Sequence, residues 1–185
     1  MPEGAGLFLQ ETWRLHPAVC AFTSEIFYEG KLRSHGGCAR QEVLGDAPFT
    51  GAGLWWVPAP HEGNQSASVE EVEAVVSIYQ ELTSGRASWR NPDGDVSAVS
   101  ADDVLLVAPY NLQVTALSKR LPNARVGTVD EFQGQEAVVV IYSMTSSSAE
   151  EAPRGMEFLY SRPTGDTAGG RRRIILVEKL PGVSR

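Results

Sequence analysis

One polar loop between apolar segments constrains the fold of this chain more than any other feature. The loop is Thr128-Val129-Asp130-Glu131-Phe132-Gln133-Gly134-Gln135-Glu136, and it leads directly into an apolar segment at 137–144. Short glycine-bearing loops between strands are where α/β proteins bind nucleotides. Two more apolar strands are predicted at 104–108 and 126–129, separated by an amphipathic helix at 110–121. Strands without polar alternation, separated by helices, indicate a parallel sheet covered on both faces.

Two helices are predicted in the first half of the chain. Pro17 stands where a first helical turn accepts a residue without an N–H, and apolar residues then recur at mixed helical spacing. We therefore expect a helix near 17–28. Ser68 and Glu71 have the spacing of a capping box, and a helical period of apolar residues follows them up to Gly85.

The segments between these elements carry turn and breaker residues. Residues 33–53 are rich in glycine and polar side chains, so we expect a surface connection that leads to a short strand at 54–57. Asn91-Pro92-Asp93-Gly94 is a strong turn signal, which predicts a protruding loop or small hairpin. Near the end of the chain, an apolar run predicts an edge strand at 174–178.

Composition sets the outer limits of the interpretation. The chain has 185 residues, 42% of them hydrophobic and 21% charged, which suits one ordinary globular core. Its 16 Lys and Arg against 23 Asp and Glu leave a formal net charge of -7. No overall positive field attracts a phosphate backbone, so any contact with nucleic acid must be local.

The cysteines and histidines do not predict a metal centre. Cys20 and Cys38 lack the spacing of a zinc motif, and we interpret them as reduced intracellular thiols, with a disulfide as the alternative. His16, His35 and His61 share no ligand spacing with each other or with the cysteines. Apolar runs fall far short of the ~20 residues that span a bilayer, and no basic and apolar leader is present, so a cytoplasmic protein without a membrane segment is expected.

Two short segments contain candidate functional residues. In Thr12-Trp13-Arg14-Leu15-His16-Pro17, the arginine is able to bind a carboxylate or phosphate through two N–H groups, and the tryptophan to stack on a base or pack in a core. In the polar loop, Gly134 lets the backbone approach a ligand closely, and Glu136 is able to accept hydrogen bonds from a ribose hydroxyl. A plain structural turn is the alternative for this loop.

These segments resemble two motifs of superfamily 1 helicases. Residues 126–136 are similar to the fifth motif, and 12–17 are similar to the fourth motif of the branch that contains the nonsense-mediated-decay helicase and the nuclease-fused bacterial helicases. The resemblance extends over roughly residues 7–161. It implies an α/β three-layer, RecA-like second motor domain of an ATP-dependent DNA helicase, which hydrolyses ATP while it translocates along a single strand of DNA or RNA.

The resemblance also implies roles for individual residues. On the nucleotide side, Trp13 would stack on adenine and Arg14 would reach the γ-phosphate as the catalytic residue, with Gly134 and Glu136 nearby. On the nucleic-acid side, the loop would contribute Thr128, Asp130 and Gln133, and a Pro-Tyr-x-x-Gln segment at a helix start would contribute Tyr110 and Gln113.

The chain also departs from the family pattern at one loop position. Relatives often carry a basic residue where this chain has Glu131. A carboxylate there repels phosphate, so we expect a weaker hold on nucleic acid.

Several parts of a complete motor are missing from the sequence. It has no phosphate loop ending in Gly-Lys-Ser or Gly-Lys-Thr and no acidic Mg²⁺ ligand of the kind that a first motor domain supplies. ATP would therefore be shared with that domain, Mg²⁺ would be held through it, and the chain alone should show no useful ATPase activity.

Where relatives continue into a sixth motif with an arginine finger, this chain has Arg162-Pro163-Thr164-Gly165-Asp166. We therefore expect a partial domain at 1–161, a divergent tail at 162–185, and a truncated or frame-shifted product. The role of the Arg171-Arg172-Arg173 run stays open.

Two alternatives remain open at this point. The first is a degenerate, non-catalytic helicase module that binds nucleic acid or a protein. The second is an unrelated α/β nucleotide-binding protein, which would bind ATP tightly by itself.

Overall fold

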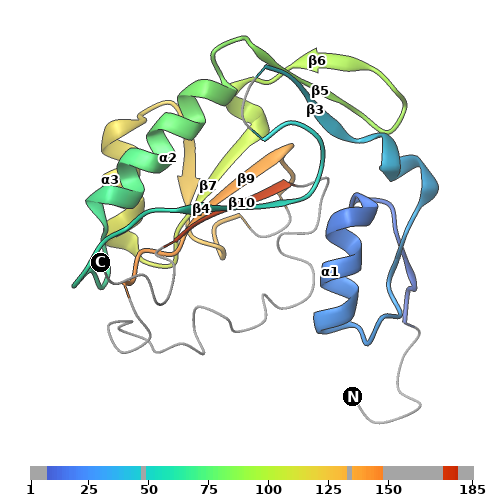
Figure 1. Cartoon of the computed structure of the whole chain (residues 1–185), viewed down its shortest axis with the longest axis horizontal. Helices are drawn as coiled ribbons and strands as arrows, with labels where there is room; N and C mark the ends of the chain where they lie inside the picture. The colour runs from blue at the N-terminus through green and yellow to red at the C-terminus, as the bar shows by residue number, and fades with distance from the viewer. Residues whose placement is uncertain (1–7, 47–48, 133–134, 148–172, 179–185) are drawn as a thin grey trace.

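A five-stranded parallel sheet lies at the centre of the fold, with the strand order β4-β10-β9-β7-β8 (Figure 1). The computed structural model describes residues 8–46, 49–132, 135–147 and 173–178. Every neighbouring pair of strands in this sheet is parallel, which confirms the predicted parallel α/β fold. The strands are β4 (Leu54–Pro58), β7 (Val104–Val107), β8 (Arg125–Gly127), β9 (Val139–Ser143) and β10 (Arg173–Glu178).

Two helices cover one side of this sheet. Helices α2 (Val69–Leu82) and α3 (Asn111–Arg120) lie together there, whereas α1 (Pro17–Phe27) lies apart from them, in a small unit that packs against Leu54 at the start of β4 (Figure 1). All three were predicted from the apolar period, and their ends agree with the prediction to within a few residues. Within the described part of the chain, none of the helices has the length and apolar character needed to cross a membrane.

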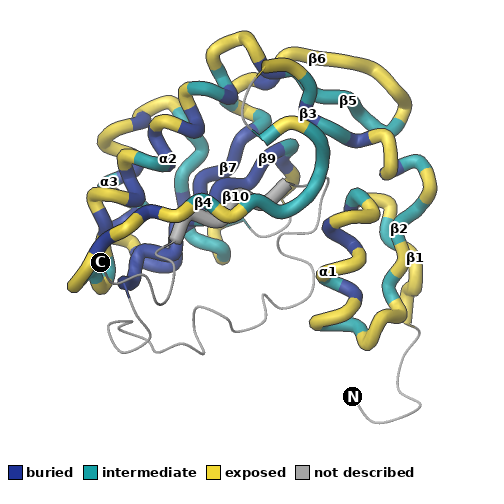
Figure 2. The backbone as a smooth tube through the Cα atoms, in the orientation of Figure 1, coloured by how far each residue is buried: buried dark blue, intermediate teal, exposed yellow. Residues whose placement is uncertain are grey.

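The strand β7 shows that both sheet faces are covered. Val104 and Leu106 belong to the main core beneath α2 and α3, whereas Leu105 and Val107 belong to a second cluster on the opposite face. All four side chains are buried, and β7 is drawn in dark blue, the colour of buried residues, in Figure 2. The second cluster includes Phe132 from the polar loop, so this loop itself covers part of the sheet.

A smaller antiparallel sheet has the order β3-β5-β6. The predicted hairpin is confirmed, because β5 (Ala87–Arg90) and β6 (Val96–Ala98) pair across the turn at 91–94. The expected surface connection at 33–53 is only partly right, since it contains β3 (Glu42–Gly45), which pairs with β5. A strand whose partner is distant in the sequence leaves no local turn signal.

A third unit surrounds α1. The strand β1 (Glu11–Thr12) pairs in parallel with β2 (Arg33–Ser34), and a short 3-10 helix, η1 (Gly36–Arg40), follows. Apolar residues of this unit pack against Leu54 at the start of β4. Both cysteines are buried thiols, and burial of the Cys20 thiol, together with the nearby Cys38, raises the pKa of Cys20.

The strand β10 corrects the prediction of an edge strand at 174–178. It pairs with β4 on one side and β9 on the other, so it is an inner strand of the main sheet. The run Ile174-Ile175-Leu176-Val177 has no polar alternation, which is the pattern of a strand covered on both faces. The expected boundary near residue 161 lies outside the described residues.

Candidate functional site

The two segments that carry the predicted nucleotide residues meet in the folded chain. The Nε of Arg14 lies 3.1 Å from Oε1 of Glu136, and the side chains are 54% and 39% exposed. Glu136 lies just ahead of β9, near the amino end of β7, because the backbone N–H of Val138 donates to the carbonyl of Asp103. This Arg14–Glu136 junction is therefore an accessible charged site at the amino ends of the sheet strands.

Local structure orients Arg14 toward this site. Its backbone N–H donates to the hydroxyl of Thr12 at 3.3 Å, and the next side chain, Leu15, is buried in the small core around α1. The ring Nδ1 of His16 then accepts from the backbone N–H of Ala18 at 3.1 Å and caps the helix. Because Leu15 is fixed in the core and α1 begins directly after it, the preceding Arg14 has its guanidinium at the surface.

Trp13, the residue before Arg14, lies at the surface and is stacked on a histidine. The ring centroids of Trp13 and His35 are 3.4 Å apart and the planes differ by 14°. His35 is held in turn because its Nδ1 accepts from the backbone N–H of Gly37 at 3.2 Å. Trp13 remains 62% exposed, so the imidazole orients the indole and leaves much of it open to a planar ligand. No sequence signal pointed to His35.

The polar loop crosses one face of the sheet. Because β8 and β9 both run parallel to β7, the loop must carry the chain from the carboxyl end of one strand to the amino end of another. Along this path Val129 and Phe132 pack against the cluster that contains Leu105 and Val107. Thr128 thus lies at the carboxyl edge and Glu136 at the amino edge of the same sheet.

At the amino-terminal end of this loop, which lies at the carboxyl edge of the sheet, a side-chain carboxylate binds the backbone. The backbone N–H of Thr128 donates to Oε2 of Glu131 at 2.7 Å, and Asp130 is exposed beside it. Gln133 and Gly134, which the sequence also predicts as site residues, lie outside the described residues. Arg171 and Arg172 lie outside them as well.

Two predicted nucleic-acid contacts prove to be internal residues. Gln113 is 0% exposed, accepts from the backbone N–H of Ser68 at 2.8 Å and donates to the hydroxyl of Ser143 at 2.9 Å. Tyr110 is 7% exposed. Both predictions of a direct contact are therefore corrected, because these side chains serve the core instead of the surface. Burial, with Tyr110 close by, raises the pKa of Tyr142 to about 12.

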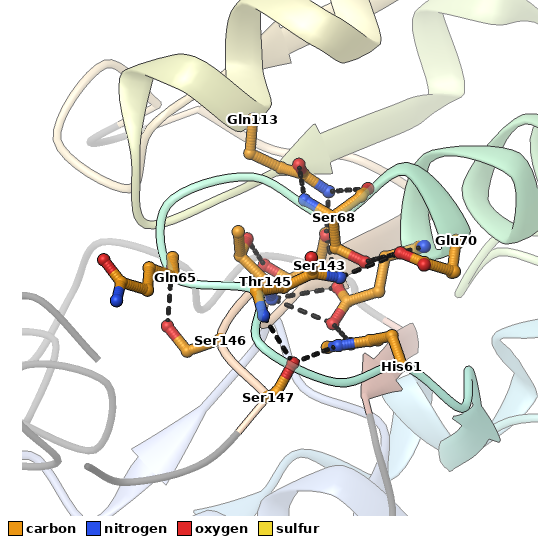
Figure 3. Close-up of polar contacts among 11 residues, drawn as sticks. His61, Gln65, Ser68, Glu70, Gln113, Ser143, Thr145, Ser146 and Ser147 are labelled. Carbon is orange, nitrogen blue, oxygen red and sulfur yellow. Dashed lines mark hydrogen bonds and ion pairs between the residues drawn. The ribbon is translucent and has the colours of Figure 1, made fainter. Parts of the chain in front are cut away.

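A buried polar network, which the sequence did not predict, lies next to Gln113 (Figure 3). Its centre is Glu71, whose carboxylate accepts from the backbone N–H of Thr145 at 2.9 Å and from the hydroxyl of Ser143. His61 joins Glu71 to Ser147, with Nε2 2.9 Å from Oε1 of Glu71 and Nδ1 2.6 Å from the serine oxygen. The network ties the start of α2 to the segment after β9.

This network explains how Glu71 differs from the predicted capping box. Ser68 does accept from the backbone N–H of Glu71 at 3.2 Å, but the backbone N–H of Ser68 donates to Gln113. The carboxylate of Glu71 instead points into the core. A signal was present in the sequence, because Glu71 shares helical spacing with Val75 and Leu82 on the apolar face of α2.

A small pocket borders Glu136. Its volume is about 140 Å³, and its acidic wall does not suit a phosphate. Among the described residues, no group of three or more His, Cys, Asp or Glu side chains is arranged to hold a metal ion. The pocket is lined by Trp89, Asp102, Asp103, Glu136, Ala137 and Val138.

Comparisons with known proteins agree with this architecture. The family model described as AAA domain matches residues 3–162. The human 3′-5′ exoribonuclease HELZ2 is 29% identical over 77% of this chain and 5% of its own length. The DNA-binding protein SMUBP-2 of Mesocricetus auratus is 29% identical over 78% of this chain and 15% of its own. The DNA polymerase alpha-associated DNA helicase A of Saccharomyces cerevisiae is 24% identical over 96% of this chain and 28% of its own. The chain thus corresponds to a minor part of each relative.

Proposed function

Since the chain belongs to the AAA domain family and is a superfamily 1 helicase-like domain, we propose that it acts as the second motor domain of an ATP-driven helicase. In this role it contributes one wall of the ATP cleft and part of the track for a single strand of DNA or RNA. A first motor domain outside these 185 residues supplies the phosphate loop and the Mg²⁺ ligand. The relatives' much greater length leaves room for such a domain.

The observation that carries this proposal is the Arg14–Glu136 junction. Two segments far apart in sequence bring an arginine and a carboxylate together, and the residue before this arginine is an exposed tryptophan stacked on His35. An exposed ion pair contributes only about 0–1 kcal/mol, so a triphosphate is able to replace Glu136 as the partner of Arg14 at little cost. Trp13 offers its ring to the adenine, and Glu136 is then available to a ribose hydroxyl.

The polar loop supports the coupling that a motor needs. Its amino-terminal end, at Thr128, lies at the carboxyl edge of the sheet, where open α/β sheets bind ligands. The other end, at Glu136, lies in the Arg14–Glu136 junction. Phe132 packs the middle of the loop against the sheet face, and in the proposed role the loop couples the two ends through this contact.

A nucleotide titration followed by NMR tests this proposal directly. With the purified chain, ATP at millimolar concentration should shift the indole resonance of Trp13 and the Nε resonance of Arg14. Arg14→Ala should abolish the shift at Trp13, whereas the control Arg40→Ala, at an exposed arginine of η1, should leave it unchanged. Shifts confined to other parts of the chain would rule out this nucleotide surface.

An ATPase assay with single-stranded DNA tests the need for a second domain. The chain alone should hydrolyse ATP at the background rate, because phosphoryl transfer requires the phosphate-loop lysine and Mg²⁺. Activity well above background that is lost in Arg14→Ala would overturn this requirement.

A second candidate function is a non-catalytic module that binds nucleic acid or protein. The acidic wall beside Glu136 favours it over an ATP site, because that wall repels the triphosphate of a nucleotide bound at Arg14. In this case ATP should leave the Trp13 and Arg14 resonances unchanged while an oligonucleotide or a protein partner still binds.

A further inference from the structure

We propose that Glu131 masks an anion-binding site at the backbone N–H of Thr128, and so weakens the hold of this chain on the phosphates of single-stranded nucleic acid. The inference rests on the proposed function in one respect, namely that the Thr128 end of the loop faces the strand. The masking itself is a property of this chain's own residues.

The geometry at Thr128 is that of an occupied anion site. Its backbone N–H donates to the Glu131 carboxylate at 2.7 Å, a length typical of a charge-assisted hydrogen bond. Backbone N–H groups in loops at strand ends are donors to phosphate oxygens in complexes with nucleic acids. In this structure the carboxylate occupies the position that a phosphate oxygen would take.

The backbone is shaped to admit this carboxylate. A Cβ placed on Gly127 would lie 2.6 Å from Oε2 of Glu131 and 3.1 Å from the ring of Phe132. The absence of a Cβ at Gly127 lets the Glu131 carboxylate and the Phe132 ring lie this close to the end of β8, and a larger residue would require both to shift. The carbonyl of Glu131 also accepts from the side-chain amide of Gln135 at 3.2 Å, which holds the turn closed.

A phosphate is nevertheless able to replace the Glu131 carboxylate at the N–H of Thr128. It is exposed, and its bond to Thr128 is local, so the side chain is able to rotate away without disturbing the core. An incoming phosphate must therefore displace the carboxylate and also overcome its repulsion. These two effects act in the same direction, and removing both should raise affinity for a phosphate backbone on the order of tenfold.

Two substitutions separate the effects. Glu131→Gln keeps an oxygen that is able to accept from Thr128 but removes the charge, whereas Glu131→Ala removes both. Glu25→Gln, at an exposed position of α1, changes the net charge by the same amount and is the matched control. We expect affinity to rise in the order wild type and Glu25→Gln, then Glu131→Gln, then Glu131→Ala.

The first measurement uses inorganic phosphate alone. In the full chain, phosphate should shift the amide resonance of Thr128 in Glu131→Ala and leave it nearly unchanged in the wild type. If the Thr128 amide of Glu131→Ala ignores phosphate, the N–H is no anion site and the inference is wrong. Circular dichroism of each variant confirms that the fold is retained.

The second measurement uses a fluorescent oligothymidylate and records anisotropy at a fixed salt concentration. About tenfold tighter binding by Glu131→Ala supports the inference, and measurable binding of the oligonucleotide by Glu131→Ala that is no tighter than that of Glu25→Gln overturns it. If phosphate shifts Thr128 only in the Glu131 variants while none of the proteins binds the oligonucleotide, masking stands. The strand contact in the proposed function then fails separately.

Discussion

Glu71 and His61 form a completely buried pair at the carboxyl end of the sheet, with Oε1 of the carboxylate 2.9 Å from Nε2 of the imidazole. The same carboxylate accepts from Ser143 and from the backbone of Thr145. Removing one partner of a buried, hydrogen-bonded network leaves polar groups in the core without compensation. The attachment of the start of α2 to the segment after β9 should therefore depend strongly on Glu71.

We expect Glu71→Ala to lower the free energy of unfolding by about 3–5 kcal/mol, because His61 and Ser143 then stay buried without their acceptor. Urea unfolding followed by circular dichroism measures this change. The neighbouring Glu70 is exposed, and Glu70→Ala should cost far less. Equal losses at the two positions would mean that the network has little energetic importance.

Replacing Gln113 tests its internal role. Gln113→Leu should reduce the free energy of unfolding by about 1–3 kcal/mol, because the backbone N–H of Ser68 loses its acceptor inside the protein. The adjacent Leu112 is 64% exposed, and Leu112→Gln should leave stability nearly unchanged. If the Gln113→Leu variant is as stable as the wild type but binds an oligonucleotide more weakly, the prediction that Gln113 contacts nucleic acid directly would be right after all.

A methyl group at Gly127 should disturb the polar loop. In Gly127→Ala the new Cβ meets the Glu131 carboxylate, which is able to rotate away, and the ring of Phe132, which must shift slightly, so we expect a loss of about 1 kcal/mol in the free energy of unfolding. Gly36→Ala is a suitable control, since no atom lies within 4 Å of a Cβ placed there. Comparing Gly127→Ala with a Gly127→Ala, Glu131→Ala double variant by thermal unfolding shows how much of the loss comes from the carboxylate.

Stability should fall at alkaline pH because of Tyr142. Burial raises the pKa of this phenol to about 12, above its ordinary value of 10.0, so between these pH values only the unfolded chain releases the proton. The unfolded state then binds fewer protons, and stability is fully present below about pH 10 and decreases as pH rises to about 12. The loss should reach roughly 2–3 kcal/mol. Tyr142→Phe should show a shallower decline in urea unfolding across this range, and identical slopes would contradict the assignment.

The Arg14–Glu136 pair should contribute little to stability. Both side chains are substantially exposed, so a double-mutant cycle of Arg14→Ala and Glu136→Ala should yield a coupling of about 0–1 kcal/mol. Thermal unfolding at low and high salt measures it. A coupling of several kcal/mol would show that the pair stabilises the fold. Arg14 would then not exchange Glu136 for a nucleotide at little cost, which contradicts the proposed site.

The sequence by itself determined the elements whose signals are local. The apolar period and the cap at Ser68 placed α2, Pro17 placed the start of α1, and the turn at 91–94 placed the hairpin. The sequence also identified the two motif segments, 12–17 and 126–136, because their residue types and spacing are unusual. Each of these signals depends on interactions within a few residues of the chain.

Only the tertiary structure decided which of these segments meet. The strand β10 pairs with β4 and β9, and β3 pairs with β5, although these partners are far apart in the sequence. The burial of Gln113 also depends on residues far along the chain. The same holds for the ion pair that joins Arg14 to Glu136. Such contacts arise from the packing of whole layers, and no local pattern of residues specifies which distant neighbour a strand or a side chain will contact.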